Sequence, residues 1–221
     1  MTKNISHSHR DMTNIAGLLV LFVTSYFLVI DAASISTTAA PKCALFHDIF
    51  KVIPADKVKE IENNHLKNDE GFRAAISYLQ SSNWTDLVGQ VLKTPEYKEF
   101  EKMAAKYKIN VDDLLKNIRS FITSIKIEGK TTAAPNLKPF FKDIENIIPI
   151  FEITKSLSAQ LNNPEFVKIR SDIASKENQK VAENLHNIPQ MVKLREILKQ
   201  MNFDVEPYIA LIYAFLGWTH P

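Results

Sequence analysis

Four histidines follow the first 33 residues of this chain, and imidazole is the side chain best suited to proton transfer near neutral pH. None of them stands at the H-E-x-x-H spacing or another metal-ligand spacing, and a single cysteine cannot complete a cysteine-based site. The sequence therefore predicts no metal site. Two of the histidines lie beside apolar residues of expected helices, which favours a structural role. The four are His47, His65, His186 and His220, of which His65 and His186 are the helical pair.

Motifs for nucleophilic catalysis or phosphate binding are absent: the sequence contains no G-x-S-x-G, no P-loop and no G-x-G-x-x-G. Cys43 and His47 stand four residues apart and could meet on one helix face, but no second copy of this pair occurs. We therefore expect no catalytic residue and no cofactor. We interpret Cys43 as a small buried apolar residue, with a disulfide between two chains as the alternative.

A duplicated phrase sets the organisation of the chain. Thr-Thr-Ala-Ala-Pro at 37–41 recurs at 131–135, and each copy precedes Asp-Ile-x-x-x-Ile-Pro, which begins at Asp48 and at Asp143. Two phrases kept in the same register indicate duplication of a module of about 95 residues. We interpret the pentapeptide as a spacer. The shared aspartate is expected to cap a helix or to pair across the interface between modules, because two acids alone do not make a mechanism.

The composition is that of a globular protein without a nucleic-acid partner. The chain has 221 residues, of which 45% are apolar and 24% charged, so it is long enough to bury a sizeable core. Its net charge is only +2, and basic and acidic residues alternate without a basic block. Five glycines in the whole chain also argue against a turn-rich, all-β protein.

Residues 1–33 have the layout of a secretory signal peptide. Basic residues precede an uncharged run from Ile15 to Ile30, and small residues follow it. We predict cleavage after Ala33 or Ser34, export of the rest of the chain, and a spacer over 34–43. An uncleaved signal anchor is the alternative, because the run approaches the roughly 18–20 residues that span a bilayer.

Each module is predicted to be a string of about six short helices. Apolar residues recur at helical spacing, and helix starts are marked by capping residues, prolines and acids, as in Thr94-Pro95-Glu96. The chain is expected to be all-α, with two tandem repeats that close into one capsule-like body with an apolar interior. The predicted organisation is repeat 1 at 44–127, a linker at 128–139 and repeat 2 at 140–221, with a glycosylation sequon at Asn83 in a loop between helices.

The last helix of each repeat carries the strongest apolar pattern. In the first repeat it forms one stripe opposite solvent-type residues, whereas in the second repeat Ala210, Leu211 and Ala214 make the other face apolar as well. A helix that is apolar on all sides is expected to be buried, either in a filled core or around a hollow one. The candidate cavity-lining residues are Leu114, Ile118, Phe121, Ile122 and Ile125, together with Tyr208, Ile212, Phe215 and Leu216.

A series of short motifs, in this order and duplicated, resembles the insect allergen-related repeat family. That family includes the cockroach major allergen repeats, mosquito midgut microvillar proteins and butterfly nitrile-specifier proteins. The resemblance covers about residues 44–217. After Asp-Ile-x-x-x-Ile-Pro, the motifs are Leu66-x-x-Asp69-Glu70-x-Phe72, Tyr78-Leu79-x-Ser81, Pro95-Glu96 and Val111-x-x-Leu114-Leu115-x-x-Ile118.

This resemblance implies two six-helix repeats around a large apolar cavity that holds fatty acids or phospholipids. It also implies secretion into the insect midgut lumen or a place at the microvillar surface. We expect a lipid-binding protein rather than an enzyme. The alternatives are a detoxifying protein like the nitrile-specifier branch, for which no residues map here, and a structural protein in peripheral association with the microvillar membrane.

Overall fold

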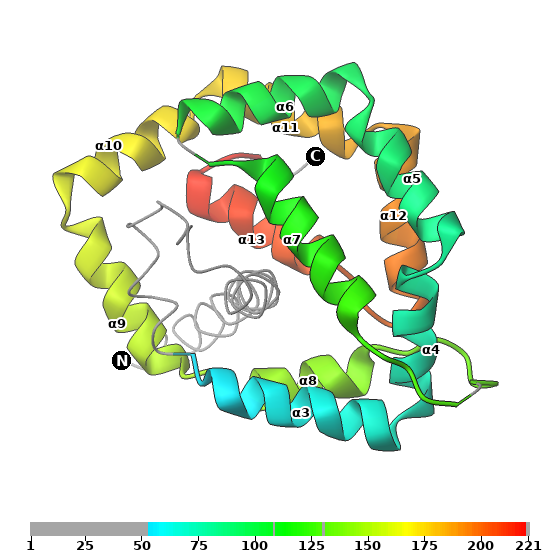
Figure 1. Ribbon diagram of the computed structural model, residues 1–221. Coiled ribbons are helices and arrows are strands. Elements are labelled where there is room, and N and C mark those ends of the chain that lie inside the picture. Colours follow the sequence, from blue (N-terminus) through cyan, green and yellow to red (C-terminus); the bar gives the residue numbers. More distant parts are fainter. Residues whose placement is uncertain (1–52, 108, 130, 220–221) are drawn as a thin grey trace, which may run out of the picture.

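Eleven α-helices and no strand make up the described part of the chain, which confirms the all-α prediction. The computed structural model describes residues 53–219 apart from residues 108 and 130 (Figure 1). The helices are α3 (Ala55–Asn68), α4 (Glu70–Leu79), α5 (Ser82–Leu92), α6 (Pro95–Lys106), α7 (Val111–Ser124), α8 (Lys138–Ile147), α9 (Ile150–Leu161), α10 (Pro164–Ile173), α11 (Lys176–His186), α12 (Pro189–Gln200) and α13 (Glu206–Leu216).

Some of the sequence-based predictions concern residues outside this described part. Within it, no helix is both long enough and apolar enough to cross a lipid bilayer. The predictions that lie outside are the signal peptide at 1–33, the spacer at 34–43, and the roles of Cys43, His47, Asp48 and His220.

Side-chain caps start several helices where the sequence predicts them. Asp69 Oδ1 accepts the amide of Phe72 at 3.0 Å, and the Thr94 hydroxyl accepts an amide three residues later at 3.2 Å. Asn110 caps α7 in the same way. Each cap satisfies an amide group that the first turn of a helix leaves without a partner in the helix itself, so these residues fix where the helices begin.

The helices of the two halves of the chain begin at matching positions. α3 starts at Ala55 and α9 at Ile150, 95 residues later, while α6 and α12 start at Pro95 and Pro189, 94 residues apart. Close packing follows the same pattern, because α6 lies along α11 and α5 lies along α12. Each of these pairs joins one half of the chain to the other, so the halves form a single body.

The packed pairs surround an area that α7 and α13 cross (Figure 1). α3 and α8 lie together on one side, and α6 and α11 lie opposite them. α5 with α12 lies on one of the two sides between these pairs, and α9 and α10 lie on the other (Figure 1). α7 packs along α6, and α13 packs along α10, but α7 and α13 are not among the closely packed pairs. Each of these two helices therefore has its closest packing with a helix of the frame.

Aromatic side chains from both halves meet in a buried central cluster. The ring of Phe72 stacks on Phe140 with 4.7 Å between centroids, and Phe141 stacks on Phe203 at 4.0 Å. Such pairs add about 0.5–1.5 kcal/mol to the free energy gained by burying the rings. This contact holds the start of α8 against α4 and the turn before α13. The buried members of the cluster are Phe72, Ala75, Ile76, Ile125, Leu137, Met201, Phe203 and Val205.

The second copy of the duplicated pentapeptide is more than the spacer that the sequence suggests, because it is hydrogen-bonded to the start of α4. Glu70 Oε1 accepts the amides of Thr132 and Ala133 at 2.5 and 3.2 Å and the Thr132 hydroxyl at 3.1 Å. The amide of Thr132 is the main cause that holds the pKa of the Glu70 carboxyl below its ordinary value, and the amide of Ala133 adds to it. The carboxylate thus ties the linker to the first half.

The linker also passes very close to the backbone of α4. The amide of Asn136 donates to the Gly71 carbonyl at 3.0 Å, and a Cβ placed on Gly71 would lie 3.0 Å from Asn136 Cβ. Any other residue at Gly71 would therefore force Asn136 to shift. One residue further on, the Leu137 amide donates to the Met201 carbonyl at 2.8 Å, and α8 begins at Lys138, inside the range predicted for the linker.

Replacing Glu70 with Ala is expected to release the linker, because the amides of Thr132 and Ala133 lose their acceptor. Hydrogen exchange at these amides should become faster while the helices keep their protection. In the unmodified protein the contact is present above the ordinary carboxyl pKa and is lost as the pH falls through the lowered pKa of Glu70. Glu96→Ala, which removes an acid from the first turn of α6, is the control. Equal exchange in both variants would contradict this assignment.

Candidate functional site

The nine predicted cavity-lining residues lie on the two crossing helices and at the end of one of them. Four are on α7, Ile125 follows the last turn of α7, and the remaining four are on α13. Both helices cross the area that the frame surrounds (Figure 1). The α7 residues are Leu114, Ile118, Phe121 and Ile122, and the α13 residues are Tyr208, Ile212, Phe215 and Leu216.

The structure separates these nine residues into two groups. Phe121, Ile125 and Tyr208 pack into the buried central cluster. The other six belong to none of the buried apolar clusters of the described residues and are only partly buried. Core side chains of this kind are normally covered on all sides by other side chains. The six residues left without such cover are Leu114, Ile118, Ile122, Ile212, Phe215 and Leu216.

Incomplete burial extends over the whole length of both crossing helices. None of the residues of α7 is buried, although one face of this helix is continuously apolar, and in α13 only Tyr213 is buried. α7 and α13 are not among the closely packed helix pairs, and most apolar side chains of both helices remain only partly buried. The two helices therefore offer apolar surface that the described residues leave partly uncovered.

Polar contacts hold α7 at both ends. At its start, the buried Tyr97 hydroxyl donates to Asp112 Oδ1 at 2.6 Å. Burial raises the pKa of the Tyr97 phenol well above its ordinary value, and the bond to Asp112 raises it further. The same bond lowers the pKa of the Asp112 carboxyl. At the other end, Gln80 Nε2 donates to the carbonyls of Ile122 and Ile125 at 2.7 and 2.8 Å.

Charged side chains hold α13 in a comparable way. Arg170 of α10 donates through Nε to the Phe215 carbonyl at 3.0 Å, and its guanidinium lies 4.9 Å from the centre of the Phe215 ring. At the start of α13, Arg195 Nε lies 2.6 Å from Glu206 Oε1, with the Arg195 side chain only 12% exposed. These contacts fix the ends of both crossing helices, so their apolar middle sections keep their positions without packing on each other.

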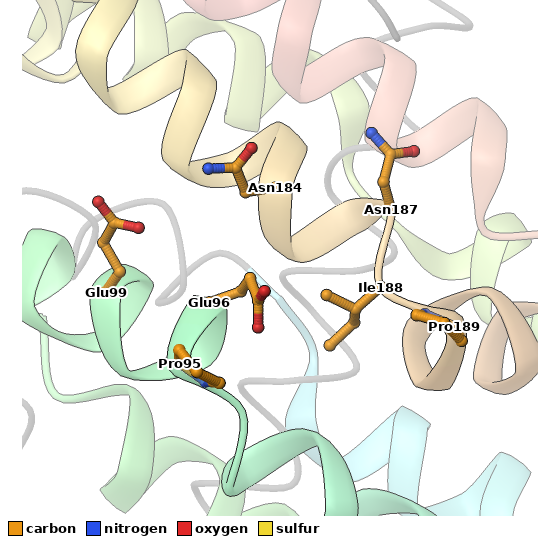
Figure 2. A pocket seen from close by; sticks show the side chains of 7 residues that line it. All are labelled: Pro95, Glu96, Glu99, Asn184, Asn187, Ile188 and Pro189. Atoms are coloured by element: carbon orange, nitrogen blue, oxygen red, sulfur yellow. The ribbon is translucent and has the colours of Figure 1, made fainter.

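A cleft in the described surface lies elsewhere. It has a volume of about 520 Å³ and opens between α6 and the adjoining ends of α11 and α12 (Figure 2). Carboxylates and amides line much of it, so an apolar ligand would find few partners there. A second cleft, of about 260 Å³, lies between α3 and α8. The lining of the larger cleft is Pro95, Glu96, Glu99, Asn184, Asn187, Ile188 and Pro189.

Comparison with known protein families identifies the family of this all-helical chain. A family model described as insect allergen related repeat, nitrile-specifier detoxification, matches residues 43–209. The chain belongs to this insect allergen-related repeat family. A search of the curated proteins finds no match to the chain.

The family match ends in the first turn of α13, at residue 209. It includes all of α7 and the partly buried residues Leu114, Ile118 and Ile122. Three members of the candidate lining lie beyond it, namely Ile212, Phe215 and Leu216. The candidate residues on α7 thus lie within the range that the family model matches. Ile212, Phe215 and Leu216 are supported by their place in this structure and not by the family match.

A buried histidine in this allergen-repeat protein joins the two halves of the chain. His65 Nε2 lies 3.0 Å from Asp143 Oδ2 of α8, and Nδ1 lies 2.9 Å from Asp69 Oδ2. The rings of Phe72 and Phe140 each lie 5.6 Å from the imidazole. Asp143 therefore has one of its two predicted roles, the pairing across the module interface, and His65 has the structural role expected from the sequence.

Asn83 and His186 are the remaining described residues for which the sequence gives a prediction. Asn83 is exposed in the first turn of α5, not in the predicted loop, because Ser81 caps that helix upstream and the helix begins at Ser82. His186 is the last residue of α11, where its carbonyl accepts Arg195 Nη1 at 2.7 Å. Among the residues that the structure describes, no three histidines, cysteines or acids are grouped as they would be around a metal ion.

Tyr97→Phe is expected to loosen the start of α7, because the Asp112 carboxylate loses its buried donor. The free energy of unfolding should fall by about 1 kcal/mol, toward the lower end for a hydrogen bond to a charged group, since Asp112 is exposed to water. Urea denaturation of the variant and of the unmodified protein measures this change. Tyr78→Phe is the control, and an equal effect of both substitutions would contradict the special role of Tyr97.

Proposed function

We propose that this protein binds lipid-like apolar molecules, fatty acids or phospholipids, in an interior space between α7 and α13. The observation that carries the proposal is the group of six apolar residues on these helices that join none of the buried clusters and are only partly buried. An acyl chain matches such a lining, because each buried methylene contributes about 0.8 kcal/mol and needs no hydrogen-bond partner.

The end contacts of the crossing helices support a preformed binding space. Gln80 and Tyr97 hold α7 near its ends, and Arg170 and Arg195 hold α13 near its ends. A lining that is already in position loses little conformational entropy when a ligand enters. Less of the binding free energy of an apolar chain would then be lost in ordering the protein, and the affinity would be higher.

The proposed setting of this activity is outside the cell. The N-terminal pattern of residues 1–33 favours a cleaved signal peptide. Together with family membership, it supports a protein secreted into the insect midgut lumen or held at the microvillar surface, including peripheral association with the membrane there. A lipid-binding protein in this setting would carry or sequester dietary lipids and would need no catalytic residue.

A detoxifying role is the second candidate, because the matching family description itself includes nitrile-specifier detoxification. In that role the protein would redirect the breakdown of a plant or dietary toxin. Product analysis of such a breakdown reaction with and without the protein tests it, and an unchanged product mixture would exclude it. We favour lipid binding because the six uncovered apolar residues fit a ligand with an apolar chain.

Solvent extraction of protein purified without detergent, followed by mass spectrometry, tests the lipid-binding proposal. The expected result is a fatty acid or phospholipid recovered in a fixed ratio to protein. Ile118→Glu and Ile212→Glu should each lower that ratio roughly tenfold, because a buried carboxylate opposes an acyl chain by more than 1.4 kcal/mol. A ligand-free protein would contradict the proposal.

Phe151→Glu is the matched control for these two variants. Phe151 lies on α9 with 75% of its surface exposed, outside the crossing helices, so its replacement should leave the bound lipid unchanged. Circular dichroism of all three variants separates loss of ligand from loss of fold. An equal loss of lipid in the control and in the interior variants would place the ligand elsewhere on the protein.

A further inference from the structure

The α3–α4 corner contains an imidazole between two carboxylates. Only 7% of the His65 side chain is exposed, and each ring nitrogen lies within 3.0 Å of a carboxylate oxygen, from Asp69 on one side and Asp143 on the other. A neutral imidazole carries one N–H and one lone pair, whereas the imidazolium ion carries two N–H donors. Both contacts can be hydrogen bonds at once only when the ring is protonated.

We infer that His65 is a pH-sensitive latch that joins the α3–α4 corner to α8. In its protonated form the ring donates to both carboxylates and holds the two halves of the chain together. Loss of one proton leaves a nitrogen lone pair facing a carboxylate oxygen, and this contact becomes repulsive. The proton on the ring therefore decides whether the contact between the two halves is attractive or repulsive.

The two carboxylates differ in a way that determines which contact opens. The Asp69 side chain is 21% exposed and also accepts the amide of Phe72 as the cap of α4. The Asp143 side chain is 48% exposed, so water can solvate it once the ring no longer donates. The neutral ring is therefore expected to keep its proton on Nδ1, toward Asp69, and to release Asp143. The contact that is lost is the one between the two halves.

The surroundings of the ring favour this assignment. Phe72 of α4 and Phe140 of α8 cover it with apolar surface and limit the access of water. The nearest cation on α4, Arg73, is engaged elsewhere, since Nη1 donates to the carbonyls of Leu66 and Lys67 at 3.1 and 3.2 Å. The charged groups on the packed elements are Asp56, Lys57, Lys59, Glu60, Glu62 and Lys67 on α3, Asp69 between α3 and α4, Glu70 and Arg73 on α4, and Lys138, Lys142, Asp143 and Glu145 on α8.

The latch also lies next to the hydrogen bonds that hold the linker. Glu70 and Gly71, which hold residues 131–136, directly follow Asp69 in the same corner. When Asp143 is released, α8 keeps its contacts with the linker and with Phe72, so the body is loosened at this corner and does not come apart. The latch is a property of the protein without ligand, and it does not rest on the proposed lipid binding.

Thermal unfolding at about pH 6 and about pH 8.5 tests the latch with Asp143→Asn as the variant. Both values lie above the ordinary carboxyl range, so the carboxylates stay charged. An asparagine amide can accept from a protonated ring or donate to a neutral one, so the variant should lose the dependence on the ring proton. We expect the fall in Tm between the two pH values to be about 2–5 °C smaller in the variant than in the unmodified protein.

Asp86→Asn, at an exposed position of α5, is the control and should keep the full pH dependence. If Asp143→Asn does not fold, nitrogen NMR of the ring in the unmodified protein provides the same test. The expected spectrum shows His65 protonated at both nitrogens at the lower pH and at Nδ1 alone at the higher pH, with faster exchange of α8 amides. An unchanged pH dependence in the variant, or a ring whose protonation does not change between these values, would overturn the inference.

Discussion

Each half of this chain buries apolar side chains against the other half, and the rest of the structure depends on this constraint. Phe72 of the first half stacks on Phe140 of the second, and Tyr97 of the first half lies in a buried cluster with Leu185 and Ile188 of the second. A buried aromatic ring of this size contributes about 1.5–3 kcal/mol relative to an exposed one. A single half would leave these rings in water, so the stable unit is the pair of halves. The polar contacts of His65 and Glu70 then fix how the halves meet.

Closing two strings of short helices on each other produces a frame, and two helices that carry apolar stripes cross it. α6 with α11 and α5 with α12 bury their faces within the frame. α7 and α13 cross it and are held near their ends by Gln80, Tyr97, Arg170 and Arg195, while six of their apolar side chains stay only partly buried and outside the buried clusters. Apolar surface held in place in this way suits a ligand with an acyl chain, which is the basis of the proposed function.

Local and repeated features of this structure could be predicted from the sequence, because they depend on neighbouring residues. Asp69, Thr94 and Asn110 identify helix starts through capping, and the duplicated phrase gives the offset that the helices follow. The contacts at the ends of α7 and α13 could not be predicted in this way. Gln80 reaches carbonyls 42 and 45 residues away, and Arg170 reaches one 45 residues away. Such contacts depend on the final arrangement of the helices and have no local pattern.

The contacts of the linker and the burial of the candidate site could not be predicted from the sequence either. The pentapeptide at 131–135 contains only small residues and proline, so nothing in it indicates that Glu70 binds its amides. The apolar stripe of α7 predicts a buried face, yet the helix has no buried residue. Hydrophobic periodicity reports which face turns inward and is the same whether side chains or a ligand cover that face. The nine lining residues were therefore identifiable as a group, whereas their division into core and uncovered members required the structure.

A crystal structure of protein purified without detergent or organic solvent tests the central claim most directly. The account predicts elongated electron density between α7 and α13, in contact with Ile118 and Ile212 and not continuous with any side chain. Density of that shape would show that a ligand covers the apolar surface that the two halves leave open. Direct side-chain contact between α7 and α13, with no space or density between them, would contradict the account.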